Sequence, residues 1–238
     1  MAYRKLIAPT LKELFIKELE GMILSGELHI GDRLPPEREL ANMMQISRSA
    51  VNDGIVEMAR KGFLEIKPRQ GTYVADYHKD GTLEILVSIM SYNGGQLPPD
   101  EIRSILELRG VLLNFGLEKA VPIMTEQQIV RLEEQSGRIS SDTPPREAAR
   151  LSYDFDHMLS GFSGNTLLPL FFCSFKLPIT VLWERYFSLY GTEGMIRRNE
   201  ELLAAIRLRD GGRAQAIISN SIKATISGDT QIYDPVSL

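Results

Sequence analysis

Four polar side chains in the first quarter of the chain are spaced so that they share one side of a predicted helix. Arg48, Ser49, Asn52 and Asp53 alternate with apolar residues at helical intervals, so the polar group faces outward. In the major groove of DNA, arginine pairs with guanine, asparagine with adenine, and serine with a phosphate or a base edge. Asp53 fits only if it accepts from cytosine or pairs with a neighbouring arginine. The group predicts a surface that reads bases in double-stranded DNA.

Three predicted helices position this surface. The third begins after Ser47, whose hydroxyl suits a helix cap, and runs from about Arg48 to Arg60. The second begins at Pro35-Pro36, because proline fits the first turn of a helix, where amide donors lack partners. The first begins near Leu11 and ends at Ser25-Gly26. Apolar residues at three- and four-residue steps describe an amphipathic first helix: Leu11, Leu14, Phe15, Leu19, Met22 and Ile23. In the second and third helices the predicted inward positions are Leu40, Ala41, Met44, Val51, Ile55 and Met58.

A basic hairpin is predicted directly after the third helix. Residues 63–66 and 72–75 have the composition of short strands, and Lys67-Pro68-Arg69-Gln70-Gly71 joins them. Cations at the tip of such a hairpin suit the minor groove or the flanking phosphates. The alternative is a surface hairpin that is basic for no functional reason. Following two helices of a helix-turn-helix, it is better interpreted as a wing that contacts DNA through Lys67 and Arg69.

Residues 11–75 resemble the DNA-binding domain of the GntR family of bacterial regulators. The shared pattern is Gly-Asp-x-Leu-Pro-x-Glu-Arg-x-Leu-Ala from Gly31, Ser-Arg-x-x-Val from Ser47, and Gly-Thr-x-Val from Gly71. The resemblance implies base contacts for Arg38 and Arg48, backbone or base contacts for Glu37, Ser47, Ser49 and Ala50, and a wing contact for Arg69. Many members carry arginine where this chain has Asn52, so its operator is expected to differ from the commonest half-site.

The rest of the chain is predicted to be helical. Apolar residues recur at helical spacing over 99–120, 125–136, 144–162, 167–189, 193–209 and 212–226. Pro122, Gly164-Asn165 and Gly211-Gly212 are expected to separate these helices. We therefore expect a mainly α protein with four parts. These are a winged helix-turn-helix domain (1–77), a linker that can hold a short helix (78–98), an antiparallel helical bundle for effector binding and dimerisation (99–230), and a tail (231–238).

This layout resembles the all-helical effector domain of the FadR subgroup of the same family. The resemblance is carried by Glu107-Leu108-Arg109, by Tyr153 through Asn165, and by the pattern from Leu202 to Ala216. Many members of the subgroup hold a divalent metal with one aspartate and three histidines. The corresponding positions here are Ser152, Asp156, Asn199 and Ser221, and none matches. We predict no metal and no cofactor, and we expect His157 and Asp154 to be a hydrogen-bonded or exposed pair.

Effector-binding residues are predicted from charge and aromatic content. Arg109 lies among apolar residues, so its guanidinium needs either an anionic ligand or an Asp or Glu partner. The aromatic run from Leu167 to Tyr190 could line a ligand cavity or be ordinary core. The predicted effector-binding residues are Arg109, Tyr153, His157, Trp183 and Tyr186. The ligand class stays open between a small carboxylate and an acyl-CoA or fatty-acid-like molecule, which the resemblance to FadR implies.

Composition limits the classes of protein that remain. The 238 residues are 43% hydrophobic with a net charge of −4, which suits two soluble domains. Residues 1–77 carry 11 Lys and Arg against 11 Asp and Glu, so DNA binding depends on where the cations lie. The sequence shows neither a membrane span nor a secretion signal, so we expect a cytoplasmic protein. The only cysteine, Cys173, is expected to be buried.

These features together predict a DNA-binding transcriptional regulator. A homodimer would bind a near-palindromic operator, and a small-molecule effector in the bundle would shift its affinity for DNA. In the alternative, the bundle is only a dimerisation module without a ligand. We expect no enzyme, because Ser152, Asp154, Asp156 and His157 share one predicted helix, whereas catalytic triads usually combine separate elements.

Overall fold

The chain divides into two compact units, Met1–Leu97 and Pro98–Leu238. The computed structural model describes residues 8–82, 84–92 and 98–232. Both units are mostly helical, and the one sheet in the described residues is a two-stranded hairpin. This is the predicted fold class: a winged helix-turn-helix followed by a helical bundle. No helix in the described ranges is long and apolar enough to cross a membrane.

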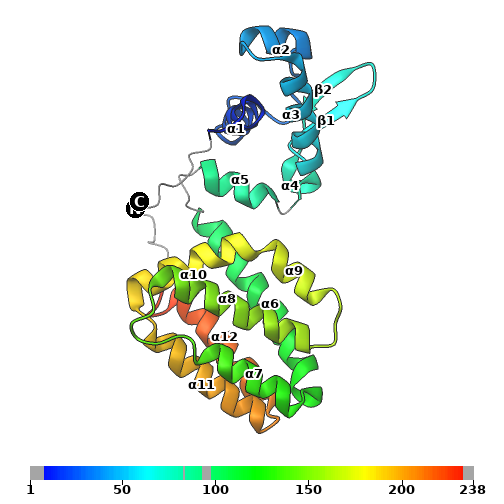
Figure 1. Ribbon diagram of the computed structural model, residues 1–238. Helices are drawn as coiled ribbons and strands as arrows, with labels where there is room; N and C mark the ends of the chain where they lie inside the picture. The colour runs from blue at the N-terminus through cyan, green and yellow to red at the C-terminus, as the bar shows by residue number, and fades with distance from the viewer. Residues whose placement is uncertain (1–7, 83, 93–97, 233–238) are drawn as a thin grey trace. The chain divides into compact units, whose positions relative to one another are not determined.

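The N-terminal unit contains the predicted helices and wing in the expected order (Figure 1). In the hairpin, Leu64 lies opposite Val74 and Lys67 opposite Gly71. The second helix begins one residue after Pro36, so the two prolines precede it and do not form its first turn. The elements are α1 (Leu11–Leu24), α2 (Glu37–Met43), α3 (Arg48–Lys61), β1 (Leu64–Lys67), β2 (Gly71–Val74), α4 (Tyr77–Asp80) and α5 (Glu84–Tyr92).

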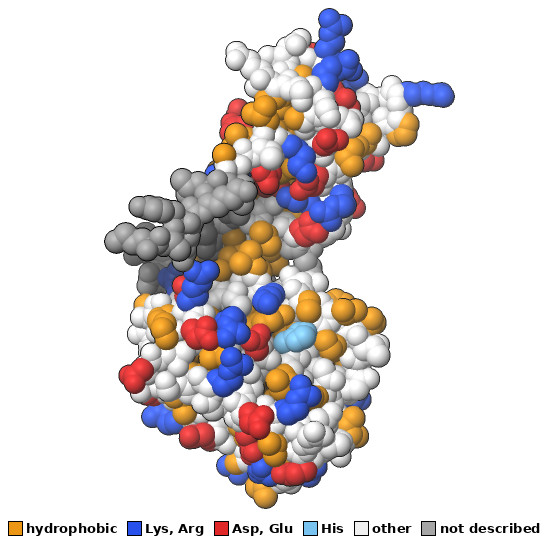
Figure 2. Space-filling view, viewed as in Figure 1, with side chains coloured by type: hydrophobic (Ala, Val, Ile, Leu, Met, Phe, Trp, Pro, Cys, Tyr) orange, Lys and Arg blue, Asp and Glu red, His pale blue; other side chains and the backbone are white. Residues whose placement is uncertain are grey.

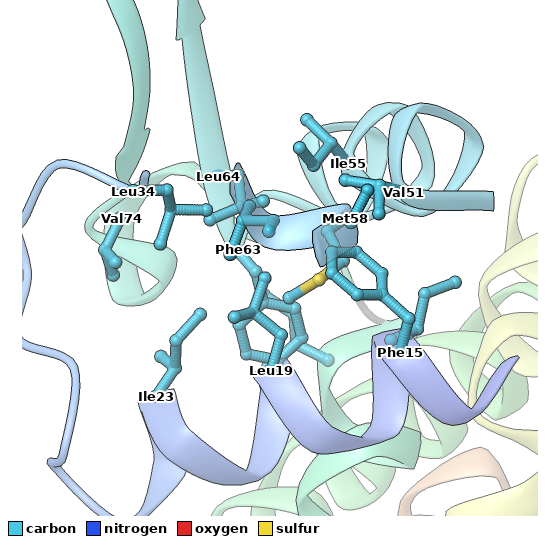
Figure 3. Packing of buried hydrophobic residues seen from close by; sticks show 14 residues of the cluster. Phe15, Leu19, Ile23, Leu34, Val51, Ile55, Met58, Phe63, Leu64 and Val74 are labelled. Carbon is cyan, nitrogen blue, oxygen red and sulfur yellow. The ribbon is translucent and has the colours of Figure 1, made fainter. Parts of the chain in front are cut away.

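A hydrophobic core holds this unit together. Figure 3 shows α1 and α3 directing apolar side chains toward one another and toward the base of the hairpin. Val51 and Met58 have no exposed surface, and Ile55 is also buried, which confirms the predicted inward face of α3. The core comprises Phe15, Ile16, Leu19, Ile23, Leu34, Leu40, Ala41, Val51, Ile55, Met58, Phe63, Leu64, Val74 and Ile85.

Two glycines allow the close packing around α3. A Cβ atom at Gly54 would overlap the ring of Phe15, so α1 can approach α3 only where the side chain is a hydrogen. Gly62 ends α3 with a φ of 95°, a left-handed conformation that glycine adopts without strain. A Cβ there would lie 2.5 Å from the carbonyl oxygen of Asp80. The glycine therefore serves both the turn and the packing of α4.

The segment between the hairpin and residue 93 belongs to the N-terminal unit. It contains α4, which the sequence did not predict, and α5, which packs against α1. Ile85 joins the hydrophobic core. The buried Glu20 carboxylate of α1 accepts from Lys61 of α3 and from Ser88 of α5, each at 2.9 Å. The predicted linker thus includes a helix that is fixed to the DNA-binding fold at several points.

The C-terminal unit is a bundle of seven described helices. Helix α8 packs against α6, α7, α9 and α10, and α12 packs against α6 and α11 (Figure 1). Leu117, Leu132, Phe155 and Ile206 are fully buried between them. The helices are α6 (Pro99–Ile123), α7 (Glu126–Ser136), α8 (Pro145–Phe162), α9 (Leu168–Ser174), α10 (Lys176–Tyr190), α11 (Glu193–Arg207) and α12 (Gly211–Ser227).

Two predicted helix boundaries in the bundle were wrong. The single helix predicted over 167–189 is two helices, because the backbone leaves the helical conformation at Phe175. Pro178 follows three residues later, and its ring cannot be accommodated inside a continuous helix. Pro122 was expected to separate two helices, but it lies within α6, one residue before its end. Proline has no amide hydrogen, so α6 loses one backbone hydrogen bond at Pro122. Because Pro122 lies in the last turn, the helix is not interrupted before its end.

Candidate functional site

The N-terminus of α3 has the predicted arrangement of cap and exposed polar side chains. The Ser47 hydroxyl accepts a hydrogen bond from the backbone N–H of Ala50 at 3.1 Å, which caps the helix. Arg48, Ser49 and Asn52 are exposed beyond the cap. Ala50 is half-buried, so its side chain presents little surface. The α3 residues placed to meet DNA bases are therefore those on the outward face of its first two turns.

Three arginines gather in one surface groove beside this helix. Arg33, Arg38 and Arg48 line a groove of about 310 Å³ together with Glu37 and the residue pair Gly71-Thr72. Within the described residues, none of the three guanidiniums forms an ion pair. In Figure 2 Lys and Arg side chains project from the end of this unit that carries α2 and the hairpin. Unpaired guanidiniums in a groove are available to phosphates and base edges.

Arg33 is a candidate DNA contact that the sequence analysis missed. It precedes α2 and forms an isolated bridge with Tyr73 of the hairpin. Its guanidinium also lies against Gly71, where a Cβ would be 2.9 Å from Nε. The sequence signal was the cation inside the Gly31-Asp32-Arg33-Leu34 turn, but only the folded hairpin places it in the groove.

The exposed Asn52 side chain forms a hydrogen bond with Glu37. Its side-chain Nδ2 donates to Oε1 of Glu37 at 3.1 Å, which joins the second turn of α3 to the first residue of α2. Glu37 is half-buried, and Asn52 is exposed. Both residues were predicted to contact DNA, but their hydrogen bond to one another was not foreseen.

The two wing cations have different surroundings. The Lys67 Nζ atom lies 3.1 Å from a Glu65 carboxylate oxygen and 4.8 Å from the centre of the Tyr73 ring. Arg69 is exposed at the tip with a φ of 63°, which costs strain in any residue other than glycine. Among the described residues Arg69 has no ion-pair partner, whereas Lys67 has one, so Arg69 is the better placed of the two predicted wing contacts.

A buried ion pair lies inside the C-terminal unit. The Nε atom of Arg109 in α6 donates to Oδ2 of Asp156 in α8 at 3.0 Å, and both side chains are almost fully buried. The Arg109 guanidinium also lies 4.6 Å from the centre of the Trp183 ring. The sequence left two kinds of partner open for Arg109, an anionic ligand or an acidic side chain. In the structure its partner is an acidic side chain, Asp156.

A second buried guanidinium, Arg198 of α11, lies close to this pair. It donates twice to Oδ1 of Asn199, and its Nη1 atom has no partner among the described residues. Burial lowers the pKa of Arg198 to about 10, and Arg109 lowers it as well, whereas Asp156 acts in the opposite direction. The described interior of the C-terminal unit therefore holds two guanidiniums and one carboxylate. The sequence analysis missed Arg198, because helical spacing alone did not distinguish it from its exposed neighbour Arg197.

Other buried polar atoms of the C-terminal unit also lack partners. Within the described residues these include Asp156 Oδ1, Ser152 Oγ and Trp183 Nε1. An unpaired buried donor or acceptor costs about 1–3 kcal/mol. Asp156 and Trp183 both lie beside the Arg109 guanidinium, so unmet hydrogen-bonding capacity gathers around the buried ion pair.

Three of the five predicted effector-binding residues line one cavity. Arg109, Trp183 and Tyr186 line a space of about 10 Å³, roughly the size of one water molecule. Burial raises the pKa of the Tyr186 hydroxyl. The remaining lining is mostly apolar: Ile105, Leu106, Ile179, Leu182, Thr225 and Ile232. The aromatic run therefore supplies both core and cavity wall.

Tyr153 and His157 do not line this cavity. The Tyr153 hydroxyl donates to the carbonyl of Phe172 at 3.2 Å, and burial raises its pKa. The Nε2 atom of His157 lies 3.4 Å from the Cys173 sulfur. Cys173 is exposed, so the prediction of a buried thiol was wrong: α9 is short and turns this residue outward. Asp154 pairs with Arg150 at 2.9 Å rather than with His157.

Three of the four positions aligned with the subgroup's metal ligands lie in the interior of the C-terminal unit. Ser152, Asp156 and Asn199 are buried, and Ser221 is half-buried. In the part of the chain that the structure describes, no three His, Cys, Asp or Glu side chains are arranged to hold a metal ion. The guanidinium of Arg198 donates to Asn199, so a positively charged side chain already lies beside one of these positions.

The geometry defines a class of protein, a DNA-binding regulator with a winged helix-turn-helix. The family model described as "Bacterial regulatory proteins, gntR family" matches residues 12–74, and the FCD domain model matches residues 104–224. The chain belongs to the GntR family of bacterial regulatory proteins, and its C-terminal unit is an FCD domain. It is therefore a DNA-binding transcriptional regulator, and an enzymatic activity is not expected.

Curated relatives carry regulator names. The chain is 27% identical over 179 residues to the HTH-type transcriptional regulator Mce2R of Mycobacterium tuberculosis, covering 74% of this chain and 73% of that protein. It is 27% identical over 205 residues to LutR of Bacillus subtilis, covering 82% and 90%. A match to the fatty acid metabolism regulator protein of Shewanella frigidimarina is 27% identical and covers 66% and 64%.

A solved structure has the same fold. The structure of Lar, described as controlling the agr system of Listeria monocytogenes, superposes with a TM-score of 0.63 at 15% sequence identity. The superposition covers 93% of this chain and 97% of that one. At this identity the likeness speaks for the fold alone.

Proposed function

We propose that the chain acts as a homodimeric, cytoplasmic regulator of the FadR subgroup that binds a near-palindromic operator. The observation that carries the proposal is the exposed N-terminus of α3 beside a groove lined by three arginines, none of which has an ion-pair partner among the described residues. Each protomer would insert this end of α3 into the major groove of one half-site, and Arg69 at the wing tip would meet the minor groove or backbone. A two-fold dimer would then require a two-fold symmetric operator.

Selection from a random duplex library tests this proposal. The purified full chain should enrich an inverted repeat whose half-sites are separated by a fixed spacing. Light scattering of the complex should give two protomers per duplex. Enrichment of no sequence, or of a single half-site bound by a monomer, would contradict the proposal.

We propose further that the interior of the FCD domain binds a small anionic effector. Two buried guanidiniums face one carboxylate there, so an anion at the free Nη1 of Arg198 would balance the charge. The cavity lined by Arg109, Trp183 and Tyr186 holds only about 10 Å³, which favours a small carboxylate over an acyl-CoA and requires side chains to move on binding. Such movement would bias the dimer between geometries with different DNA affinity, by a coupling of about 1–3 kcal/mol.

A thermal shift panel of small mono- and dicarboxylates, inorganic phosphate and an acyl-CoA tests the effector proposal. A bound anion should raise the melting temperature with its concentration and alter the fluorescence of Trp183, the only tryptophan. Replacing Arg198 with methionine should abolish both effects. If no compound shifts the parent protein, the alternative holds, in which the bundle serves only as a dimerisation module.

A further inference from the structure

A carboxylate stands at the reading surface, where DNA phosphates would repel it. Glu37 lines the groove with Arg33, Arg38 and Arg48. Phosphates approaching this groove meet three cations and one anion, so Glu37 weakens the attraction. Within the protein, the Oε1 atom of Glu37 accepts a hydrogen bond from Nδ2 of Asn52 at 3.1 Å. The role of Glu37 should therefore be sought in what it does to Asn52.

A carboxylate fixes the orientation of an amide. An ionised Glu side chain only accepts hydrogen bonds, whereas the two ends of an Asn amide differ, because Nδ2 donates and Oδ1 accepts. Asn52 must therefore turn Nδ2 toward Glu37. A flipped amide would place Oδ1 against the carboxylate. One N–H of Asn52 is held in this way, and its Oδ1 and second N–H remain for another partner.

The remaining edge of Asn52 matches one base. Adenine offers N7 as an acceptor and the N6 amine as a donor in the major groove, which complement one N–H and one carbonyl oxygen. Guanine offers two acceptors there, and thymine offers an acceptor and a methyl group. Asn52 lies on the exposed face of α3, in the second turn after the Ser47 cap, within reach of a base edge.

We propose that Glu37 is a positioning residue that holds the Asn52 amide in the orientation that reads adenine. Glu37 acts through Asn52, and the adenine preference requires it even though its charge opposes DNA binding. The inference rests on the proposed function, because it assumes that α3 enters the major groove.

Three single variants, a double variant with both Glu37→Ala and Asn52→Ala, and a matched control test the inference on the duplex selected by the parent protein. The single variants are Asn52→Ala, Glu37→Ala and Glu37→Gln, and the control is Glu39→Ala, which removes an exposed carboxylate from the same first turn of α2. Affinity is measured for the selected duplex and for duplexes in which each base pair of one half-site is replaced in turn. Melting temperatures identify any variant that has lost its fold.

The parent should prefer adenine at one position per half-site by about tenfold or more. Asn52→Ala and Glu37→Ala should each reduce the preference at this position to about twofold or less, and the double variant should be no worse than either. Glu37→Gln should retain the preference, because its Oε1 still accepts from Asn52. Glu39→Ala should also retain it. Glu37→Ala should bind unrelated duplexes more tightly than the parent, since a repulsive charge is gone.

Other outcomes would overturn the inference. If Glu37→Ala kept the full adenine preference, the hydrogen bond would have no role in reading. If Glu37→Gln lost the preference as Glu37→Ala does, the charge and not the accepting oxygen would be responsible. Failure of the proposed function would look different, because the parent protein itself would then select no duplex.

Discussion

Replacing Arg48 with alanine should weaken binding to the selected operator by about 1–3 kcal/mol, because a bidentate arginine contact to a base carries free energy of this size. Arg48 is the first residue of α3, it is exposed, and within the described residues its guanidinium has no ion-pair partner. In the part of the chain that the structure describes, no carboxylate holds its charge away from a base. The affinity for the operator, titrated at fixed salt, measures the loss.

The matched control lies on the same helix. Arg60 is near the other end of α3, and its guanidinium pairs with Glu84 at 2.8 Å. Arg60→Ala removes the same charge from a position away from the reading end, so operator affinity should change little. The preference for one base pair per half-site should disappear only in Arg48→Ala. Equal losses in the two variants would mean that net charge, and not the position of Arg48, governs binding.

Replacing Asp156 with asparagine should destabilise the C-terminal unit by about 3–5 kcal/mol, the usual cost of leaving one member of a buried ion pair without its partner. The loss leaves Arg109 and Arg198 buried with no carboxylate between them. Trp183 lies 4.6 Å from the Arg109 guanidinium. Because it is the only tryptophan, its fluorescence during denaturant unfolding reports on this unit.

Asp154→Asn is the control, two residues away on the same helix. Its partner Arg150 is 46% exposed, and exposed pairs contribute about 0–1 kcal/mol. A double variant in which Arg109 becomes methionine and Asp156 becomes leucine should recover part of the stability, since apolar side chains replace the pair. If Asp156→Asn were no more damaging than Asp154→Asn, the interior charge cluster would not be the constraint described above.

The sequence was most informative where structure is local. The cap of α3, its inward face at Val51, Ile55 and Met58, and the hairpin follow from spacings within a few residues, and all were confirmed. The break at Phe175 was also marked locally, by Pro178, but the apolar spacing continued across it and concealed it.

Contacts between distant residues could not be derived in the same way. Glu37 and Asn52 are 15 residues apart, and Arg109 and Asp156 are 47 apart. Periodicity showed that Arg109 is buried, and it left two kinds of partner open. For Arg198 there was no comparable signal, since it adjoins Arg197 in a charged stretch. Only the packing of α11 against α7 and α12 reveals which guanidinium turns inward.

The attachment of α5 to the DNA-binding fold has a mechanical consequence. Because Ile85 is embedded in the core and Ser88 shares the Glu20 carboxylate with Lys61, α5 cannot swing freely at its junction with α1 and α3. A fragment cut after residue 77 would lack these contacts and leave a hole in its own interior, so an autonomous DNA-binding fragment should extend to Tyr92. In the full chain, a rotation of α5 would therefore rotate the helix-turn-helix with it. A helix joined to that fold only by a flexible linker would not transmit such a rotation.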